Sequence, residues 1–196
     1  MSDLATAYSM TLPDWLVAEI PSLPRTLGTD EERMALVNAL ADRNWREGNG
    51  GPFAAIVVDD ATGELISAGV NVVLSTGISS GHAEVMALAL AQRRLGRWDL
   101  GAHGARLALV VNWRPCVQCY GATMWSGVRS LVVAGDGPEL EELTGFDEGP
   151  MVEDWADRFR ARGIDVTIGV ARDDALAVFR AYGASDSVVY NARGDD

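Results

Sequence analysis

Apolar residues recur at helical spacing in the first part of the chain, beginning with a segment at residues 30–47. It follows Thr29, which lies three residues before Glu32, the spacing of a capping box. Its apolar side chains share one face of the predicted helix: Met34, Val37, Leu40 and Ala41. A glycine-rich run at 48–52 then ends the pattern, so we predict one amphipathic helix over this range.

Two β-rich runs, 53–58 and 64–70, come next and are joined by a turn-rich loop at 59–63. This pattern predicts a β-hairpin. Further apolar segments predict three strands, at 106–111, 130–134 and 164–168, and four helices, at 82–95, 116–125, 152–162 and 173–182. The alternation of helices with five strands indicates an α/β fold, in which a central mixed sheet carries helices on both faces.

The chain is predicted to form one domain, because 48% of its 196 residues are apolar and can build a single core. Residues 1–28 contain three prolines among scattered apolar side chains and are expected to form an irregular N-terminal arm packed on the domain. The domain itself is placed at 29–182. Residues 183–196 are expected to form a C-terminal tail.

Charge and hydropathy narrow the classes of function. The formal net charge is −12, from 28 acidic and 16 basic residues, which repels a phosphate backbone and disfavours nucleic acid as substrate. The sequence has no apolar run long enough to cross a bilayer, and its first ten residues lack the basic start and apolar stretch of a signal peptide. We therefore expect a cytoplasmic protein that does not bind membranes.

Candidate chemistry lies in two short motifs. Both cysteines of the chain fall in the run from Pro115 to Cys119, as Cys116 and Cys119, and one of its two histidines opens the triplet His82-Ala83-Glu84. Three such ligands suit a zinc site whose fourth position stays open to water, whereas structural zinc sites usually close with four cysteines or histidines. The cysteines, three apart at a predicted helix start, point the same way. We expect a catalytic zinc site, with Glu84 beside the open position.

Alternative interpretations of these motifs exist. A Cys-x-x-Cys pair on its own is also typical of structural or redox sites, and only its combination with His82 and Glu84 favours catalysis. The second histidine, His103, lies between glycines and is interpreted as a solvated loop residue, not a fourth ligand.

The two motifs together resemble the zinc-dependent cytidine-deaminase superfamily. Further segments are most similar to the bacterial guanine deaminases and the related guanosine deaminases: Gly51-Pro52-Phe53, Gly69-Val70-Asn71, Trp125 and Gly145-Phe146-Asp147-Glu148. The resemblance implies a three-layer α/β/α sandwich around a mixed five-stranded sheet. It also implies a homodimer in which the C-terminal tail, with Val188, Val189 and Tyr190, is exchanged between subunits and helps to close the pocket.

The resemblance assigns roles to individual residues. It implies that His82, Cys116 and Cys119 hold Zn²⁺, and that Glu84 moves protons from the attacking water to the ring and the departing amine. Substrate contacts are expected from eight residues: Phe53, Asn71, Ala83, Arg114, Trp125, Asp147, Glu148 and Tyr190. Without the resemblance, the aromatic side chains would be ordinary core, Asn71 a turn cap, and Asp147 and Glu148 part of a solvated acidic stretch.

The sequence departs from the guanine-deaminase pattern at three places. Arg114 stands where these enzymes usually carry glutamate, Val117-Gln118 replaces their usual spacer, and Glu148 stands where they tend to have aspartate.

From the resemblance we expect a zinc-dependent hydrolytic deaminase of purine metabolism that acts on a small amino-heterocycle: a guanine-like purine, an azapurine, an aminotriazine or a pterin. Two alternatives remain, a nucleoside or tRNA adenosine/cytidine deaminase and a non-catalytic zinc-stabilised module.

Overall fold

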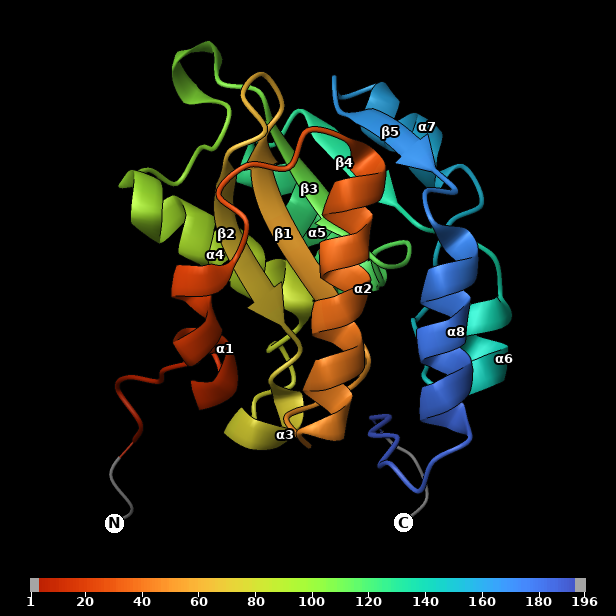
Figure 1. The fold of residues 1–196 in the computed structure, drawn as a ribbon. Coiled ribbons are helices and arrows are strands. Elements are labelled where there is room, and N and C mark those ends of the chain that lie inside the picture. The colour runs from red at the N-terminus through yellow and green to blue at the C-terminus, as the bar shows by residue number, and fades with distance from the viewer. Residues whose placement is uncertain (1–3, 193–196) are drawn as a thin grey trace.

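The computed structural model describes residues 4–192 and is built on one five-stranded sheet (Figure 1). Its strand order is β2-β1-β3-β4-β5. The pairs β1/β2 and β1/β3 are antiparallel, whereas β3/β4 and β4/β5 are parallel, so the predicted mixed sheet is confirmed. The strands are β1 (Ala54–Asp59), β2 (Leu65–Val70), β3 (Leu107–Val111), β4 (Ser130–Val133) and β5 (Asp165–Ile168).

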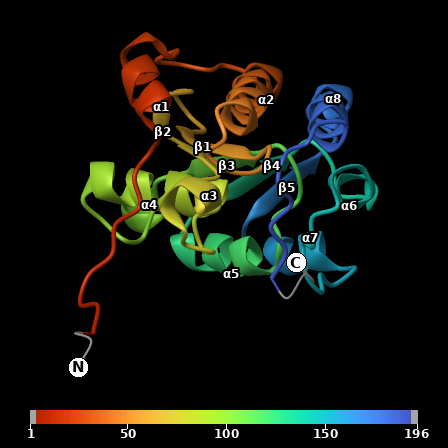
Figure 2. The ribbon, with the colours of Figure 1, turned by 90° about the horizontal axis from the view of Figure 1, so that it is seen from below.

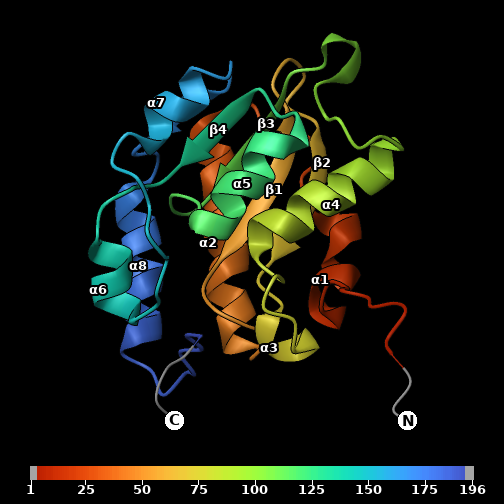
Figure 3. The same cartoon turned by 180° about the vertical axis from the view of Figure 1, so that it is seen from behind.

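Helices cover both faces of the sheet, as Figure 2 shows from below. One face carries α1 (Asp14–Glu19), α2 (Asp30–Arg46) and α8 (Arg172–Gly183). The other carries α4 (Ala83–Leu95), α5 (Val117–Ser126) and α7 (Trp155–Arg160), of which α4 and α5 lie in front of the sheet in Figure 3. Two short α-helices, α3 (Val73–Thr76) and α6 (Glu139–Thr144), and two 3₁₀ turns, Ile20–Ser22 and Ala102–Gly104, complete the elements. The predicted three-layer sandwich is therefore correct.

Strand β1 shows why the sheet is sandwiched. Its residues alternate between two apolar clusters: Ala54, Ile56 and Val58 belong to the cluster under α2 and α8, and Ala55 and Val57 to the cluster under α4 and α7. Successive side chains of a strand point to opposite faces, so a strand covered on both faces reads as one continuous apolar run. All five of these side chains are fully buried.

The predicted helices begin close to where the sequence placed them. The capping box at Thr29 and Glu32 is present, with the Thr29 hydroxyl accepting from the Glu32 amide at 3.2 Å. Helix α4 ends at Gly96, whose φ of 66° is a left-handed conformation that favours glycine. Helix α7 is shorter than the predicted 152–162, because its first residues form a turn instead.

Three short helices were not predicted. The N-terminal arm, expected to be irregular, contains α1, which buries Leu16 against the domain. The acidic loop before residue 152 contains α6, which buries Leu140, and the loop before His82 contains α3. Helices of four to six residues are not stable alone and form only through such contacts, so periodicity cannot reveal them.

The limits of the sequence-based domain division stay a prediction. Residues 1–3 of the arm and 193–196 of the tail lie outside the described residues. Within residues 4–192, no helix is both long enough and apolar enough to cross a membrane.

Candidate active site

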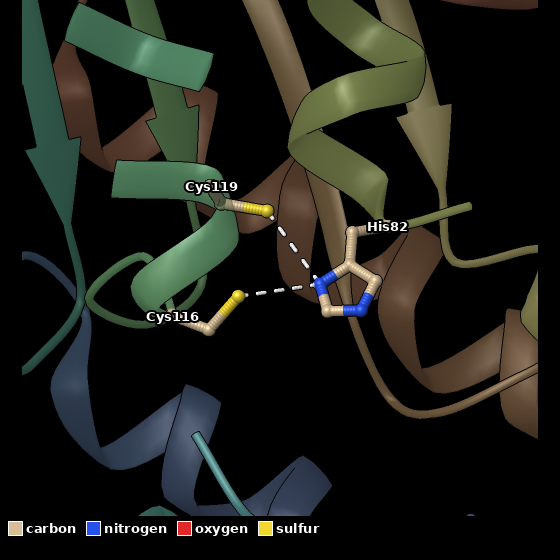
Figure 4. A group of neighbouring side chains, drawn as sticks. All are labelled: His82, Cys116 and Cys119. Carbon is tan, nitrogen blue, oxygen red and sulfur yellow. Dashed lines mark hydrogen bonds between the residues drawn. The ribbon is translucent and has the colours of Figure 1, made fainter. Parts of the chain in front are cut away.

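The three predicted metal ligands lie together between two helix starts (Figure 4). His82 is the N-cap residue of α4, Cys116 is the N-cap residue of α5, and Cys119 lies in the first turn of α5. His82 Nδ1 is 3.4 Å from Cys116 Sγ and 3.5 Å from Cys119 Sγ. The i, i+3 spacing turns both sulfurs toward the histidine, as predicted.

These distances fit a tetrahedral zinc ion. With bond lengths of about 2.05 Å to nitrogen and 2.3 Å to sulfur, such an ion separates a histidine nitrogen from a thiolate sulfur by about 3.6 Å. The ligand atoms of the triad all lie within 4.8 Å of one another, and no other such group of histidine, cysteine and acidic side chains occurs among the described residues. His103 is exposed in a loop, as predicted, and takes no part.

The protonation of the two thiols also suits a cation. A hydrogen bond from Cys119 lowers the pKa of Cys116 to about 4, with help from His82 and against the effect of burial. The same contact, together with burial, raises the pKa of Cys119 well above its ordinary value. The pair therefore holds one negative charge and one shared proton, which a divalent ion can replace to give two thiolate ligands.

Glu84 is buried next to the triad and is 6% exposed. It lies in the first turn of α4, two residues after the histidine ligand. Burial raises its pKa, and the negative charge of Cys116 raises it further. A carboxyl group whose pKa is raised toward neutrality can both accept a proton and return it, which suits general acid–base work.

His82, Cys116 and Glu84 line a cleft of about 800 Å³, within the range of ligand sites, and Cys119 is buried behind it. Six predicted substrate residues line it: Phe53, Asn71, Arg114, Asp147, Glu148 and Tyr190. Phe53 packs edge-on against Phe146, with ring centroids 5.4 Å apart, so one wall is aromatic. Phe146 itself lines the cleft and was missed as a site residue, although the sequence segment around it was noted.

Asn71 contacts both the start of α3 and the C-terminal tail. Its Oδ1 accepts from the Val73 amide at 3.1 Å, in the turn before α3, and from the Tyr190 hydroxyl at 2.8 Å. The turn-cap role and the cleft-lining role considered for Asn71 thus coexist. Because Oδ1 is used inside the protein, the amide NH₂ is the group left to meet a ligand.

The C-terminal tail folds back over the mouth of its own cleft. The Tyr190 hydroxyl accepts from the Gly51 amide at 2.8 Å, and its ring packs edge-on against Phe146 at 5.0 Å. Asn191 forms two hydrogen bonds with the 145–147 segment. Its side-chain amide donates to the Gly145 carbonyl at 2.8 Å, and its Oδ1 accepts from the Asp147 amide at 2.9 Å. A Cβ at position 51 would lie 2.9 Å from the Phe53 ring and the Tyr190 hydroxyl and 3.0 Å from the Phe146 ring, so this close approach favours glycine.

Replacing Tyr190 with phenylalanine is expected to weaken closure of the cleft. The ring contact stays, but the Gly51 amide loses its acceptor and Asn71 Oδ1 loses one of its two donors, which costs about 1–2 kcal/mol. We expect KM for the substrate to rise about tenfold, with a smaller change in kcat. Steady-state kinetics checks this against Tyr8→Phe, a control on an exposed residue of the N-terminal segment. Identical kinetics in both variants would show that the hydroxyl plays no part in closure.

Glu148 is a second carboxyl group at the cleft and is partly buried. Burial raises its pKa to about 8, and the charges of Cys116 and Glu84 add to the effect. Its backbone carbonyl accepts from the Val117 amide at 3.1 Å, which fixes the segment against the start of α5. Asp147, in contrast, is exposed, and its carboxylate accepts from the Gly149 amide at 2.8 Å.

Two predicted substrate residues do not line the cleft. The Ala83 side chain is fully buried, because the first turn of α4 packs it against the sheet and β2 at Gly69. Trp125 is 80% exposed on the outer face of α5. The substrate roles of these two residues stay predictions, and the sequence motif did not show which face of its helix each residue occupies.

Arg114 lines the cleft from the segment that follows β3. Its guanidinium forms an ion pair with Glu141 of α6 at 2.5 Å, and the two side chains are 16% and 29% exposed. Glu141 belongs to the same acidic stretch as Asp147 and Glu148, and the sequence did not indicate a partner for it. Its pairing depends on α6, which the sequence pattern did not show.

Comparison with known proteins places this site in a family. Residues 27–135 match the family described as the cytidine and deoxycytidylate deaminase zinc-binding region. A curated relative, the guanine deaminase of Bacillus subtilis strain 168, is 33% identical over 109 residues, which are 56% of this chain and 65% of that protein. The chain thus spans less than two thirds of this relative's length.

Solved structures match over nearly the whole chain. The guanine deaminase from Nitrosomonas europaea is 44% identical, with a TM-score of 0.86 over 94% of this chain and all of the other. The protein NE0047 in complex with 2,6-diaminopurine is 46% identical, with the same TM-score over 96% of this chain and 98% of that one. The fold, the matched zinc-binding region and the His82–Cys116–Cys119 triad agree, and the chain belongs to the cytidine and deoxycytidylate deaminase zinc-binding family as a guanine-deaminase-like zinc aminohydrolase.

Proposed function

We propose that this protein deaminates a small, free, guanine-like heterocycle by hydrolysis and releases ammonia. The observation that carries the proposal is the buried Glu84 beside an open three-ligand zinc triad at the bottom of a partly aromatic cleft. A purely structural zinc site has no use for such a carboxyl group, which disfavours the non-catalytic zinc module. Zinc bound to His82, Cys116 and Cys119 would polarise a water and lower its pKa to about 7.

The residues of the chain supply the remaining steps. Glu84 takes one proton from the attacking water and transfers it to a ring nitrogen, then takes the second proton from the same oxygen and passes it to the departing amine, because its raised pKa allows both directions of transfer. Phe53 and Phe146 form the apolar wall on which a flat ring lies. The Asn71 amide donates to an acceptor on the ring, and Tyr190 with Asn191 closes the mouth and excludes water.

The ring class follows from the cleft and from the relatives. A related structure with 45% identity holds 8-azaguanine, and another holds 2,6-diaminopurine, so purine-like rings occupy this fold. The cleft offers carboxyl groups at Glu84 and Glu148, which accept from ring N–H and amino groups. A free base fits this set of contacts, and the net charge of −12 disfavours a tRNA substrate.

The homodimer remains a prediction. The exchange of the tail between subunits also remains a prediction, and it concerns the contacts of Tyr190 with Gly51 and Asn71. Trp125, exposed on α5, is an apolar side chain that a second copy could cover. The mass in solution, measured by light scattering for the native protein and for Trp125→Asp, tests both points.

An ammonia-release screen of the zinc-loaded protein tests the proposed function. The panel contains guanine, 8-azaguanine, 2,6-diaminopurine, aminotriazines, pterins, guanosine, cytidine, adenosine and a tRNA stem-loop. We expect release from at least one free ring and none from the stem-loop. Salt-sensitive turnover of the stem-loop would favour the tRNA alternative. Absence of ammonia release from every compound of the panel would contradict the proposal.

A further inference from the structure

The cleft has one permanently charged cation among its described lining residues, Arg114. The other charged side chains there, apart from the metal ligands His82 and Cys116, are carboxyl groups: Glu84, Asp147 and Glu148. A guanidinium stays charged at any physiological pH and presents only hydrogen-bond donors. It therefore gives the cleft wall hydrogen-bond donors with a permanent positive charge, which no neighbouring side chain supplies.

The position of Arg114 is fixed before any ligand arrives. Its backbone amide donates to the Gly135 carbonyl at 2.8 Å, which ties the end of β3 to the loop after β4. The preceding Trp113 is buried and donates from Nε1 to the Gly137 carbonyl at 3.1 Å. The ion pair with Glu141 then holds the guanidinium itself. A donor held in this way loses little entropy when a ligand binds.

Anchoring α6 to the sheet does not require this ion pair. A second pair joins Arg172 of α8 to Glu139 of the same short helix, and Arg172 stacks over the Trp113 ring at 4.9 Å. Neither Arg172 nor Glu139 lines the cleft. The structure thus contains two similar arginine–glutamate pairs on α6, of which one faces the ligand site and one does not.

The Arg114 guanidinium keeps donors for a ligand. Among the described residues only Glu141 accepts from it, through Nη2, so Nη1 is the terminal nitrogen left for a ligand, whereas Nε is buried. The side chain is 16% exposed and lines the cleft, so an oxygen on a bound ring can reach it. An amino group on the same edge would place donor against donor beside a positive charge, which is unfavourable.

We propose that Arg114, held by Glu141, is a specificity-determining residue that selects rings presenting an oxygen acceptor, instead of an amino group, to its side of the cleft. The substrate class is then an amino-heterocycle with at least one exocyclic oxygen, neutral or anionic. Its N–H groups meet Glu148 and its oxygen meets Arg114. The proposal deepens the proposed function and rests on it.

The binding of two rings of the same size tests whether Arg114 selects for an oxygen acceptor. Melamine and cyanuric acid have the same ring size and differ in carrying three amines or three oxygens. Their dissociation constants are measured by calorimetry on zinc-loaded protein in a Glu84→Gln background, so that no ring is consumed. We expect tighter binding of cyanuric acid, and we expect Arg114→Met to reduce this preference about 10- to 100-fold, the worth of one hydrogen bond from a charged group.

Three further variants separate recognition from structure. Arg172→Met removes the matched pair outside the cleft and should leave the preference unchanged. Arg114→Lys keeps the positive charge and should retain part of the preference for cyanuric acid. It also provides a test of the charge if the methionine variant misfolds. In the double variant Arg114→Glu with Glu141→Arg, the ion pair is restored with reversed charges, and the preference should shift toward melamine.

Several results would overturn the inference. These are an unchanged preference in Arg114→Met, a return to the native preference in the charge-reversed double variant, or binding of neither ring. Failure of the proposed function is a separate result, because it is seen as absence of ammonia release by the native enzyme. The preference between the two rings is measured without turnover and does not depend on it.

Discussion

Replacing Glu84 with glutamine is expected to lower kcat for ammonia release by about 10³- to 10⁴-fold, the contribution of a positioned general acid–base group. Glutamine has nearly the same shape, so it fills the same buried position in the first turn of α4. It cannot take up or return a proton. Because Glu84 is not one of the metal ligands, the zinc content should stay at one ion per chain.

The measurement combines single-turnover ammonia release with metal analysis of the same sample. Glu139→Gln serves as the matched control, since this glutamate is partly exposed in α6 and does not line the cleft. Full activity in Glu84→Gln would remove the acid–base role. Loss of zinc together with activity would instead show that Glu84 supports the metal site.

Removal of zinc by a chelator is expected to abolish ammonia release, by about 10³-fold or more, while the fold persists. The reason for persistence is the core: two apolar clusters, one on each face of the sheet, hold the helices without any help from the ligand triad. The same result is expected for Cys119→Ala, which removes one ligand from α5. Ligand loss should lower Tm, because a metal that binds only the folded state stabilises it.

Circular dichroism and an activity assay on one chelated sample check this expectation, with zinc added back at the end. Recovery of activity shows that the loss came from the metal. Collapse of the helical signal on chelation would mean that the ion holds the fold, as it does in small zinc-stabilised modules.

The sheet and the zinc triad were predictable from the sequence because each depends on patterns of a few neighbouring residues. A continuous apolar run such as β3, or a Cys-x-x-Cys pair at the start of a helix, carries its meaning within a few residues. The resemblance of His82-Ala83-Glu84 to a known motif then brought together two segments more than thirty positions apart. The structure confirms this grouping at 3.4 Å and 3.5 Å.

The rest of the cleft depends on contacts between distant segments. Glu141 has a partner only because a six-residue helix, too short to predict, brings it to Arg114. Asn191 closes the cleft only because the tail returns to the 145–147 loop. Trp125 follows the ligand helix in sequence yet points outward, because only one face of α5 packs on the sheet.

The tail has a consequence for how the protein is made. The ribosome completes His82, Cys116 and Cys119 about 70 residues before Tyr190, which is several seconds of synthesis. The residues that cover the mouth of the cleft are thus the last of the site to emerge. The metal ligands can be assembled, and an ion can enter, before the covering residues exist.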